Sequence, residues 1–125
     1  MPTYDSTHFS PPAPVALVTL RNPESGMMKV GVSMLFDTGA DVTLLPKGVA
    51  EELGLSYLSS SYELVDFEDR AGLARAVRAE MVFLGLTFRG QFLLVEQDYG
   101  LIGRNVLNTT SLIFDGPRLS WEKSS

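Results

Sequence analysis

The sequence predicts a single domain of the mostly β class. Apolar runs rich in β-branched residues recur along the chain, and clusters of Gly, Pro, Asn, Asp and Ser separate them, as expected for strands joined by turns. Apart from one segment that fits either a helix or strands, helix signals are confined to short stretches. A chain of 125 residues buries a sufficient core without cross-links, and this one contains no cysteine to form them.

Composition excludes several classes of function. Without cysteine there is neither thiol catalysis nor a cysteine metal site, and the single histidine, His8, lies in a polar segment among prolines, where a solvated side chain is expected. We therefore expect no metal and no cofactor. The net charge of -5 argues against nucleic-acid binding. No run of about 20 apolar residues indicates a membrane span, and no basic-then-apolar N-terminus indicates secretion, so we expect a cytoplasmic protein.

The first elements are an arm and a hairpin. Residues 1–14 hold four of the seven prolines and predict an extended N-terminal arm. Residues 15–21 and 27–36 predict two strands joined by the turn cluster at 22–26. The second strand leads directly into Asp37, which therefore lies on a loop just past a strand end.

Later elements follow from similar patterns. Residues 46–53 predict a short helix that ends at Gly54. Residues 86–96 predict a further strand. A terminal hairpin is expected over residues 111–114 and 119–121, because Asp-Gly-Pro-Arg at 115–118 is a strong turn signal.

Residues 56–84 fit two structures. The second half contains good helix formers, and three apolar residues recur there at every fourth position: Leu73, Val77 and Met81. The same positions also share one face of a strand, for which residues 62–67 are a plausible antiparallel partner across the charged turn at 68–72. The residues alone leave the choice open.

The most informative motif is Asp37-Thr38-Gly39. A carboxylate that activates water for peptide hydrolysis needs a second carboxyl beside it. The pair then shares one proton, and one group acts as the base while the other acts as the acid. The sequence has no second Asp-Thr-Gly or Asp-Ser-Gly. If the chemistry is real, the partner comes from another copy of the chain across a two-fold axis. A bare Asp-Thr-Gly is also ordinary turn chemistry, and the flanking residues decide between these interpretations.

Two segments, Leu35 to Leu45 (LFDTGADVTLL) and Gly100 to Leu107 (GLIGRNVL), resemble the retropepsins, the retroviral-type aspartic proteases. The resemblance implies a homodimer of a single-lobe acid protease fold, with closed, barrel-like β-sheets and one or two short helices, one of them over 104–109. It covers residues 15–121 and leaves 122–125 as a C-terminal tail.

The resemblance implies a role for each motif residue. Asp37 and its two-fold mate would hold the attacking water. Thr38 would reach across the dimer axis, and Gly39 lets the loop run close to the carboxyls. Ala40 belongs to the same active-site loop, and with Asp41 it would bind an extended peptide through backbone groups and the Asp41 carboxylate.

Other residues are assigned in the same way. The resemblance favours a hairpin for residues 56–84, because retropepsins fold a flap over the substrate there. The flap tip would comprise Glu68, Asp69, Arg70, Ala71 and Gly72, with fewer glycines than retroviral flaps have. Arg104, after Gly103, resembles the family arginine that pairs with the Asp41 position near the dimer interface. Val42, Tyr99 and Leu101 are candidate walls for apolar substrate side chains, although each could equally be core, and Ile102 is expected in the core.

The sequence therefore predicts a homodimeric aspartic endopeptidase acting on a peptide or protein substrate. Two alternatives remain. One is a non-catalytic dimer of the same fold that binds peptides or scaffolds an assembly, although a protein that only binds has no physical need for an acid at Asp37. The other is a domain that processes only its own arm.

Overall fold

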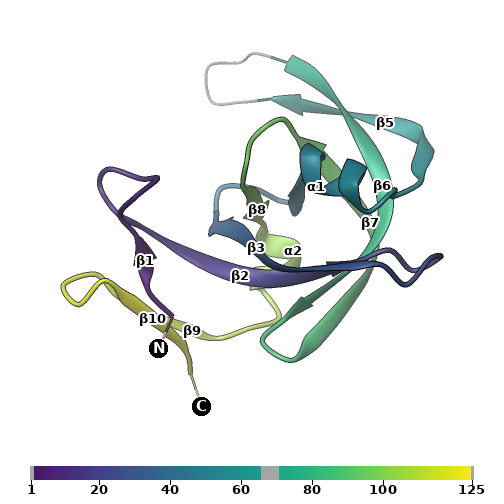
Figure 1. Cartoon of the computed structure of the whole chain (residues 1–125). Helices are drawn as coiled ribbons and strands as arrows, with labels where there is room; N and C mark the ends of the chain where they lie inside the picture. Colours follow the sequence, from purple (N-terminus) through teal and green to yellow (C-terminus); the bar gives the residue numbers. More distant parts are fainter. Residues whose placement is uncertain (1, 66–70, 125) are drawn as a thin grey trace.

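The computed structural model describes residues 2–65 and 71–124, with side chains for all of these except 59–65 and 71–74 (Figure 1). The elements are β1 (Tyr4–Asp5), β2 (Ala13–Arg21), β3 (Met28–Phe36), β4 (Leu44–Pro46), α1 (Lys47–Glu52), β5 (Tyr57–Val65), β6 (Ala71–Phe83), β7 (Leu86–Val95), β8 (Gly100–Ile102), α2 (Arg104–Leu107), β9 (Leu112–Asp115) and β10 (Ser120–Lys123). The predicted mostly β class with one or two short helices is confirmed, and the described residues form two. Within the described residues, no helix is long and apolar enough to cross a membrane.

Six strands close into a barrel in the order β2-β3-β8-β4-β7-β6. The closing contact is the antiparallel pairing of β2 with β6, where Thr19 faces Val82 and Arg21 faces Glu80. Closure removes the free edges that an open sheet of this size would expose. The strand β1 extends the sheet beside β2, and β5 extends it beside β6, so both lie outside the barrel.

Side-chain alternation on β2 fills the barrel. Ala16, Val18 and Leu20 are almost completely buried, whereas Leu17 between them is 71% exposed. This period of two is what a strand with one core face requires. From the neighbouring strand β6, Val77, Ala79 and Met81 meet the same core.

The segment that fitted both a helix and a strand is a hairpin of two strands. The β6 strand pairs with β7 continuously from Ala76 opposite Leu93 to Phe83 opposite Leu86. Buried backbone groups must be hydrogen-bonded, and this ladder satisfies them between two barrel strands, so tertiary pairing overrides the helix propensity of the sequence.

The predicted flap lies only partly within the described residues. Glu68, Asp69 and Arg70 lie outside them. Ala71 and Gly72 belong to β6 rather than to a turn, because they pair with Val65 and Leu64 of β5. The β5–β6 hairpin rises from the barrel on the side where the loop after β3 emerges (Figure 1).

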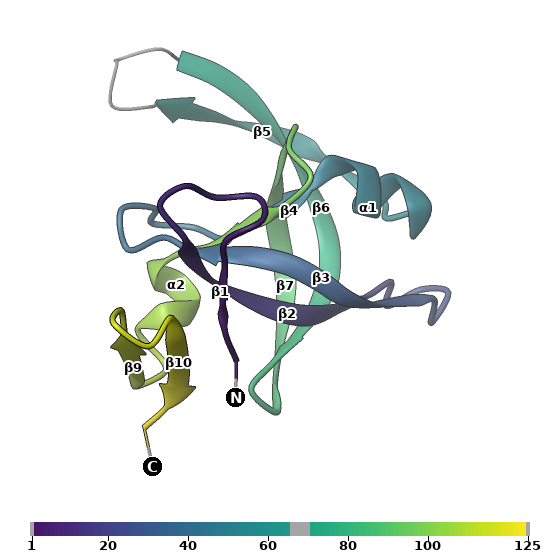
Figure 2. The ribbon, with the colours of Figure 1, turned by 60° about the vertical axis from the view of Figure 1, so that its left-hand side comes forward.

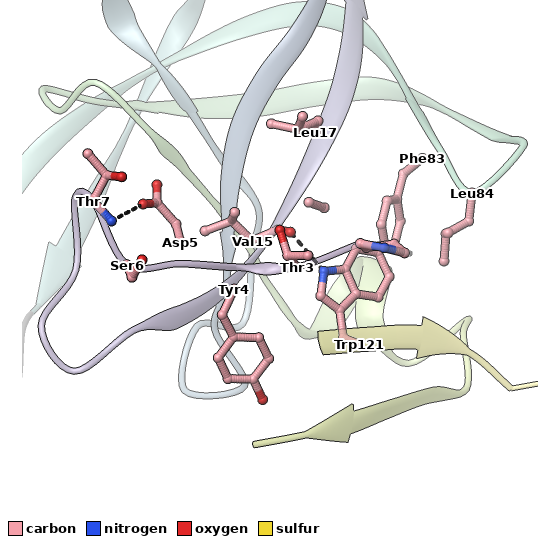
Figure 3. A pocket seen from close by; sticks show the side chains of 12 residues that line it. Thr3, Tyr4, Asp5, Ser6, Thr7, Val15, Leu17, Phe83, Leu84 and Trp121 are labelled. Atoms are coloured by element: carbon pink, nitrogen blue, oxygen red, sulfur yellow. Dashed lines mark hydrogen bonds between the residues drawn. The ribbon is translucent and has the colours of Figure 1, made fainter. Parts of the chain in front are cut away.

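The two ends of the chain lie against each other. Thr3 forms a bridge with Ser120, and the Tyr4 amide donates to the Leu119 carbonyl at 2.9 Å. The Trp121 indole donates to the Val15 carbonyl at 2.8 Å and so fastens β10 to the barrel (Figure 3). The predicted terminal hairpin is confirmed, with Phe114 opposite Trp121, and β2 and β10 each extend two residues beyond the expected strands.

Candidate active site

The strand β3 leads directly into Asp37 and is held in place by parallel pairing with β8. Met34 lies opposite Gly100 and Phe36 opposite Ile102, and the Asp37 amide donates to the Ile102 carbonyl at 3.0 Å. Ile102 is fully buried, as expected from the sequence. The ladder thus holds the backbone of Asp37 in place up to the point at which the chain turns away.

A tight turn surrounds the Asp37 carboxylate. The Gly39 amide donates to its Oδ1 atom at 2.9 Å, and the Ala40 amide donates to the Asp37 carbonyl at 3.2 Å. A Cβ atom at Gly39 would lie only 3.1 Å from the same oxygen, which is tighter than most side-chain contacts. Asp37 is half-buried, while Thr38 and Gly39 are exposed at the surface of this single chain.

The second motif packs directly beneath this loop. A Cβ atom at Gly103 would collide with the Val42 carbonyl group, so glycine is needed for the close approach of the two backbones. Just beyond it, the amides of Arg104 and Asn105 donate to the carbonyls of Ala40 and Asp41, at 2.8 and 3.3 Å. The first amides of α2, which have no partner within the helix, are satisfied by the active-site loop.

Thr43 links the two motifs from inside. Its hydroxyl accepts a hydrogen bond from the Gly103 amide at 3.1 Å and donates one to the Asn105 side-chain carbonyl at 2.8 Å. The residue is 1% exposed. No role for Thr43 or Asn105 was expected from the sequence, although a lone hydroxyl among apolar neighbours is a signal for a buried hydrogen bond.

Arg104 has a partner other than the expected one within the chain. Its guanidinium donates to the Thr38 carbonyl at 2.7 Å. No ion pair joins Arg104 to Asp41 among the described side chains, and Asp41 is exposed. The expected pairing with Asp41 is therefore absent from the single chain, where the arginine stabilises the backbone of the active-site loop.

The candidate substrate walls fall into two groups. Val42 and Leu101 pack against a small apolar cluster that is separate from the main core and comes from β4, β5, β6 and β7: Leu44, Leu58, Ala76, Leu93 and Val95. Tyr99 lies just before β8 and contacts Phe9 of the N-terminal arm, with ring centroids 5.0 Å apart and planes at 69°. No motif in the sequence pointed to Phe9.

Asp37 lines neither of two prominent cavities of the described residues. The larger, of about 610 Å³, lies between residues 2–7, β2, Phe83, Leu84 and Trp121 (Figure 3). The second lies along the terminal hairpin. The same residues contain no group of three His, Asp or Glu side chains arranged to hold a metal ion. In the single chain, Asp37 is thus half-buried on a loop whose next two residues are exposed.

Comparison with known proteins places this architecture in a class. Among solved structures, the retroviral EIAV protease complexed with the inhibitor HBY-793 is similar, with a TM-score of 0.57 and 15% sequence identity, over 84% of this chain and 91% of that chain. This likeness shows a retropepsin-like fold. The profile of the family described as Aspartyl protease matches residues 25–106, so the chain belongs to the retropepsin-like aspartic protease family. The search of curated protein sequences finds no match.

Proposed function

We propose that this protein is an aspartic endopeptidase whose active site is completed by a second copy of the chain. The observation that carries the proposal is the setting of Asp37, a single carboxylate on a tight turn that the second motif holds from below. Family membership supports protease chemistry, and the presence of one such motif in the chain calls for a two-fold mate.

The proposed reaction uses the two Asp37 carboxyls as a pair that holds one proton. The ionised carboxylate takes a proton from the bound water as it attacks the scissile carbonyl carbon, and the protonated carboxyl gives its proton to the carbonyl oxygen. Collapse of the tetrahedral intermediate then returns a proton to the departing amine. Water is the nucleophile, so no covalent acyl-enzyme forms.

The geometry of the loop bears on how a peptide would bind. The carbonyls of Ala40 and Asp41 are already occupied by the α2 amides, while the Asp41 amide and carboxylate have no partner among the described residues. We therefore assign peptide recognition to those two groups of Asp41, with the peptide lying as an added strand. The apolar side chains of Val42, Leu101 and Tyr99 would receive its side chains.

The position of the loop agrees with a partner at this face. The loop 37–43 and the arm loop between β1 and β2 project from the same side of the barrel in both views of the ribbon (Figures 1 and 2). In the proposed dimer the exposed Thr38 and Gly39 are covered by the same residues of the second copy. Thr38, Asp41, Gly103 and Arg104 then hold the paired loops together.

A mixing experiment tests the shared site. Wild-type chain and the Asp37→Asn variant are refolded together in equal amounts; asparagine has nearly the same size as aspartate. Cleavage of a peptide mixture by the mixed protein is then compared with cleavage by the same total amount of wild type alone. If each site needs one Asp37 from each copy, only dimers of two wild-type chains are active, and activity per total protein falls to about one quarter.

Two controls make the outcome decisive. Sedimentation checks that the Asp37→Asn variant forms the same dimer, and the variant alone is expected to lose cleavage by several orders of magnitude. An activity of about one half in the mixture would show that each chain acts alone and contradict the shared site. A variant that cleaves within about tenfold of wild type would move the chemistry away from Asp37.

A further inference from the structure

The outer face of β6 and β7 continues the small apolar cluster beside the active-site loop. Ala76 lies opposite Leu93 in the ladder of the two strands, and both belong to that cluster. Side chains two positions apart on a strand share a face, so the next outward pair is Arg78 opposite Gln91. The two strands run side by side from the base of the β5–β6 hairpin to their own turn at the bottom of the view (Figure 1). An apolar surface thus passes directly into a polar one on the outside of the barrel.

Arginines dominate this polar surface. The pair that follows Arg78 along the face is Glu80 opposite Arg89. Arg21 of β2 lies opposite Glu80 from the other side. The Glu80 carboxylate accepts hydrogen bonds from the Arg89 Nε atom at 2.5 Å and from the Arg21 guanidinium. Three arginines thus accompany one carboxylate, and the local charge is opposite in sign to the net charge of -5 of the whole chain.

Two of these arginines are accessible to an external group. Arg78 is exposed and forms no ion pair with another of the described side chains. Arg89 contacts Glu80 through its Nε atom, yet its side chain is 72% exposed, so much of its guanidinium remains accessible. The guanidinium fork matches the geometry of a carboxylate and binds it through two parallel hydrogen bonds. The chemistry that complements this face is therefore a pair of carboxylates.

The spacing of the arginines sets where those carboxylates would lie. Arg78 is two residues along β6 from Ala76, and Arg89 is four residues along β7 from Leu93. At about 3.4 Å per residue, they lie roughly 7 and 14 Å from the apolar cluster along the strands. An extended peptide has the same rise per residue. A peptide with one side chain in the cluster can therefore bring acidic residues two to four positions further on to the arginines.

We propose that the outer face formed by Arg78 and Arg89 is a docking surface for an acidic segment of a protein substrate, two to four residues outside the stretch that occupies the apolar cluster. This inference rests on the proposed protease function, in which Val42 and Leu101 of the cluster receive the substrate. In the proposed dimer the face occurs twice, once toward each end of a bound peptide. It selects substrates by residues outside the cleaved stretch and speeds encounter through charge attraction.

The test compares peptides that differ only in an extension. A cleaved peptide is first selected from a synthetic mixture with apolar residues around the scissile bond. It is then extended at either end by four Glu or by four Gln, and kcat/KM is measured for each product. The proteins are wild type, Arg78→Gln, Arg78→Lys and the control Arg118→Gln. Arg118 has an 84% exposed side chain and lies on the terminal hairpin, so its replacement removes the same charge elsewhere.

The readout is the ratio of kcat/KM for the Glu and Gln extensions. Wild type is expected to prefer Glu about three- to tenfold at low salt for at least one end of the peptide. Arg78→Gln reduces this ratio to less than about twofold, Arg78→Lys retains most of it because the charge remains, and Arg118→Gln keeps the wild-type ratio. The ratio falls toward one at about 1 M salt, where the Debye length is about 3 Å.

Two results overturn the docking surface. If Arg78 only supports the fold, Arg78→Gln lowers cleavage of the Glu and Gln peptides by the same factor and leaves their ratio unchanged. A wild-type protein that shows no preference for Glu at either end contradicts the proposal directly.

A binding measurement separates this inference from the proposed function. Apolar peptides with Glu or Gln extensions are titrated against the Asp37→Asn variant with and without Arg78→Gln. If wild type cleaves nothing, yet the Glu peptides bind more tightly in a way that depends on Arg78, the protease function fails and the docking surface stands. If no peptide is cleaved or bound, both are overturned. Cleavage by wild type without any effect of Arg78 on the ratio removes only the docking surface.

Discussion

The guanidinium of Arg104 donates a 2.7 Å hydrogen bond to the backbone carbonyl of Thr38, the residue that follows Asp37. The two residues are 66 positions apart, and the contact fastens the first residue of α2 to the top of the active-site loop. The Arg104 amide also holds the Ala40 carbonyl at 2.8 Å. One residue therefore fixes the loop on both sides of Gly39.

Replacing Arg104 by alanine is expected to impair catalysis more than folding. The backbone hydrogen bond to Ala40 survives, so the chain stays folded, but the Thr38 carbonyl is released and the Asp37 carboxylate loses its fixed position. We expect kcat/KM to fall about ten- to a hundredfold, since small misplacements of a catalytic group are costly. The control is Lys29→Ala, which removes an exposed cation paired with Glu52 on another part of the barrel. Equal losses in the two variants would contradict this role.

Gly103→Ala is expected to disrupt the junction of the two motifs. The new Cβ atom would meet the Val42 carbonyl, which belongs to backbone and cannot move aside cheaply. We expect the free energy of unfolding to fall by about 2 kcal/mol or more. The matched variant is Gly48→Ala in α1, where the Cβ atom meets open space and helix propensity adds up to about 1 kcal/mol. Urea unfolding of both proteins gives the comparison, and similar stabilities would show that the loop relaxes freely.

Thr43→Val tests the buried hydroxyl that joins the motifs. Valine keeps the shape but leaves the Gly103 amide and the Asn105 side chain without their partner, which is expected to cost about 1–3 kcal/mol of unfolding free energy. Thr43→Ser keeps the hydroxyl and should retain much of the wild-type stability. The measurement is thermal unfolding of the three proteins at one pH. A valine variant as stable as wild type would mean that water replaces the hydroxyl.

The Glu80 carboxylate connects three strands and makes stability depend on pH. Glu80 lies buried on β6 between Arg89 of β7, whose Nε atom is 2.5 Å away, and Arg21 of β2. The hydrogen bond from Arg89 and then that from Arg21 lower the pKa of Glu80 below its ordinary value of 4.5. The stabilisation is therefore complete above pH 4.5 and is lost as the pH falls through the lower folded-state pKa.

Glu80→Gln should consequently lower the Tm at neutral pH by more than it does in acid. Glutamine keeps the size of the side chain and removes the charge that both arginines face. The experiment follows the Tm of wild type and variant from neutral to strongly acidic pH, and the difference between them should shrink as wild-type Glu80 becomes protonated. A constant difference across the range would show that the charge of Glu80 does not contribute to stability.

Local sequence features predicted much of the barrel. The β2–β3 hairpin, the helix that ends before Gly54 and the terminal hairpin have the expected places, because each depends on neighbouring residues: an apolar run, a turn cluster or a glycine stop. Gly54 and Gly26 have positive φ angles of 62° and 79°, which glycine adopts without strain. Asp115 and Gly116 form the plain turn that their context indicated.

The β6 strand shows where local features were insufficient. Its residues favour a helix by propensity, and a spacing of four places its apolar side chains on one face of either structure. The choice was made by β7 and β2, which supply the hydrogen-bond partners of β6 on its two sides. No pattern within a short window contains this information.

By itself the sequence determined the position of Asp37 after a strand and the segment that returns to it at Gly103, and it predicted that a second carboxyl comes from another copy of the chain. Only the tertiary structure decided which side chains from distant segments meet: Arg104 with Thr38, Thr43 with Asn105, and Phe9 with Tyr99. The reason is physical. Chain direction and turns follow from adjacent residues, whereas the partner of a side chain depends on how closed strands bring distant segments together.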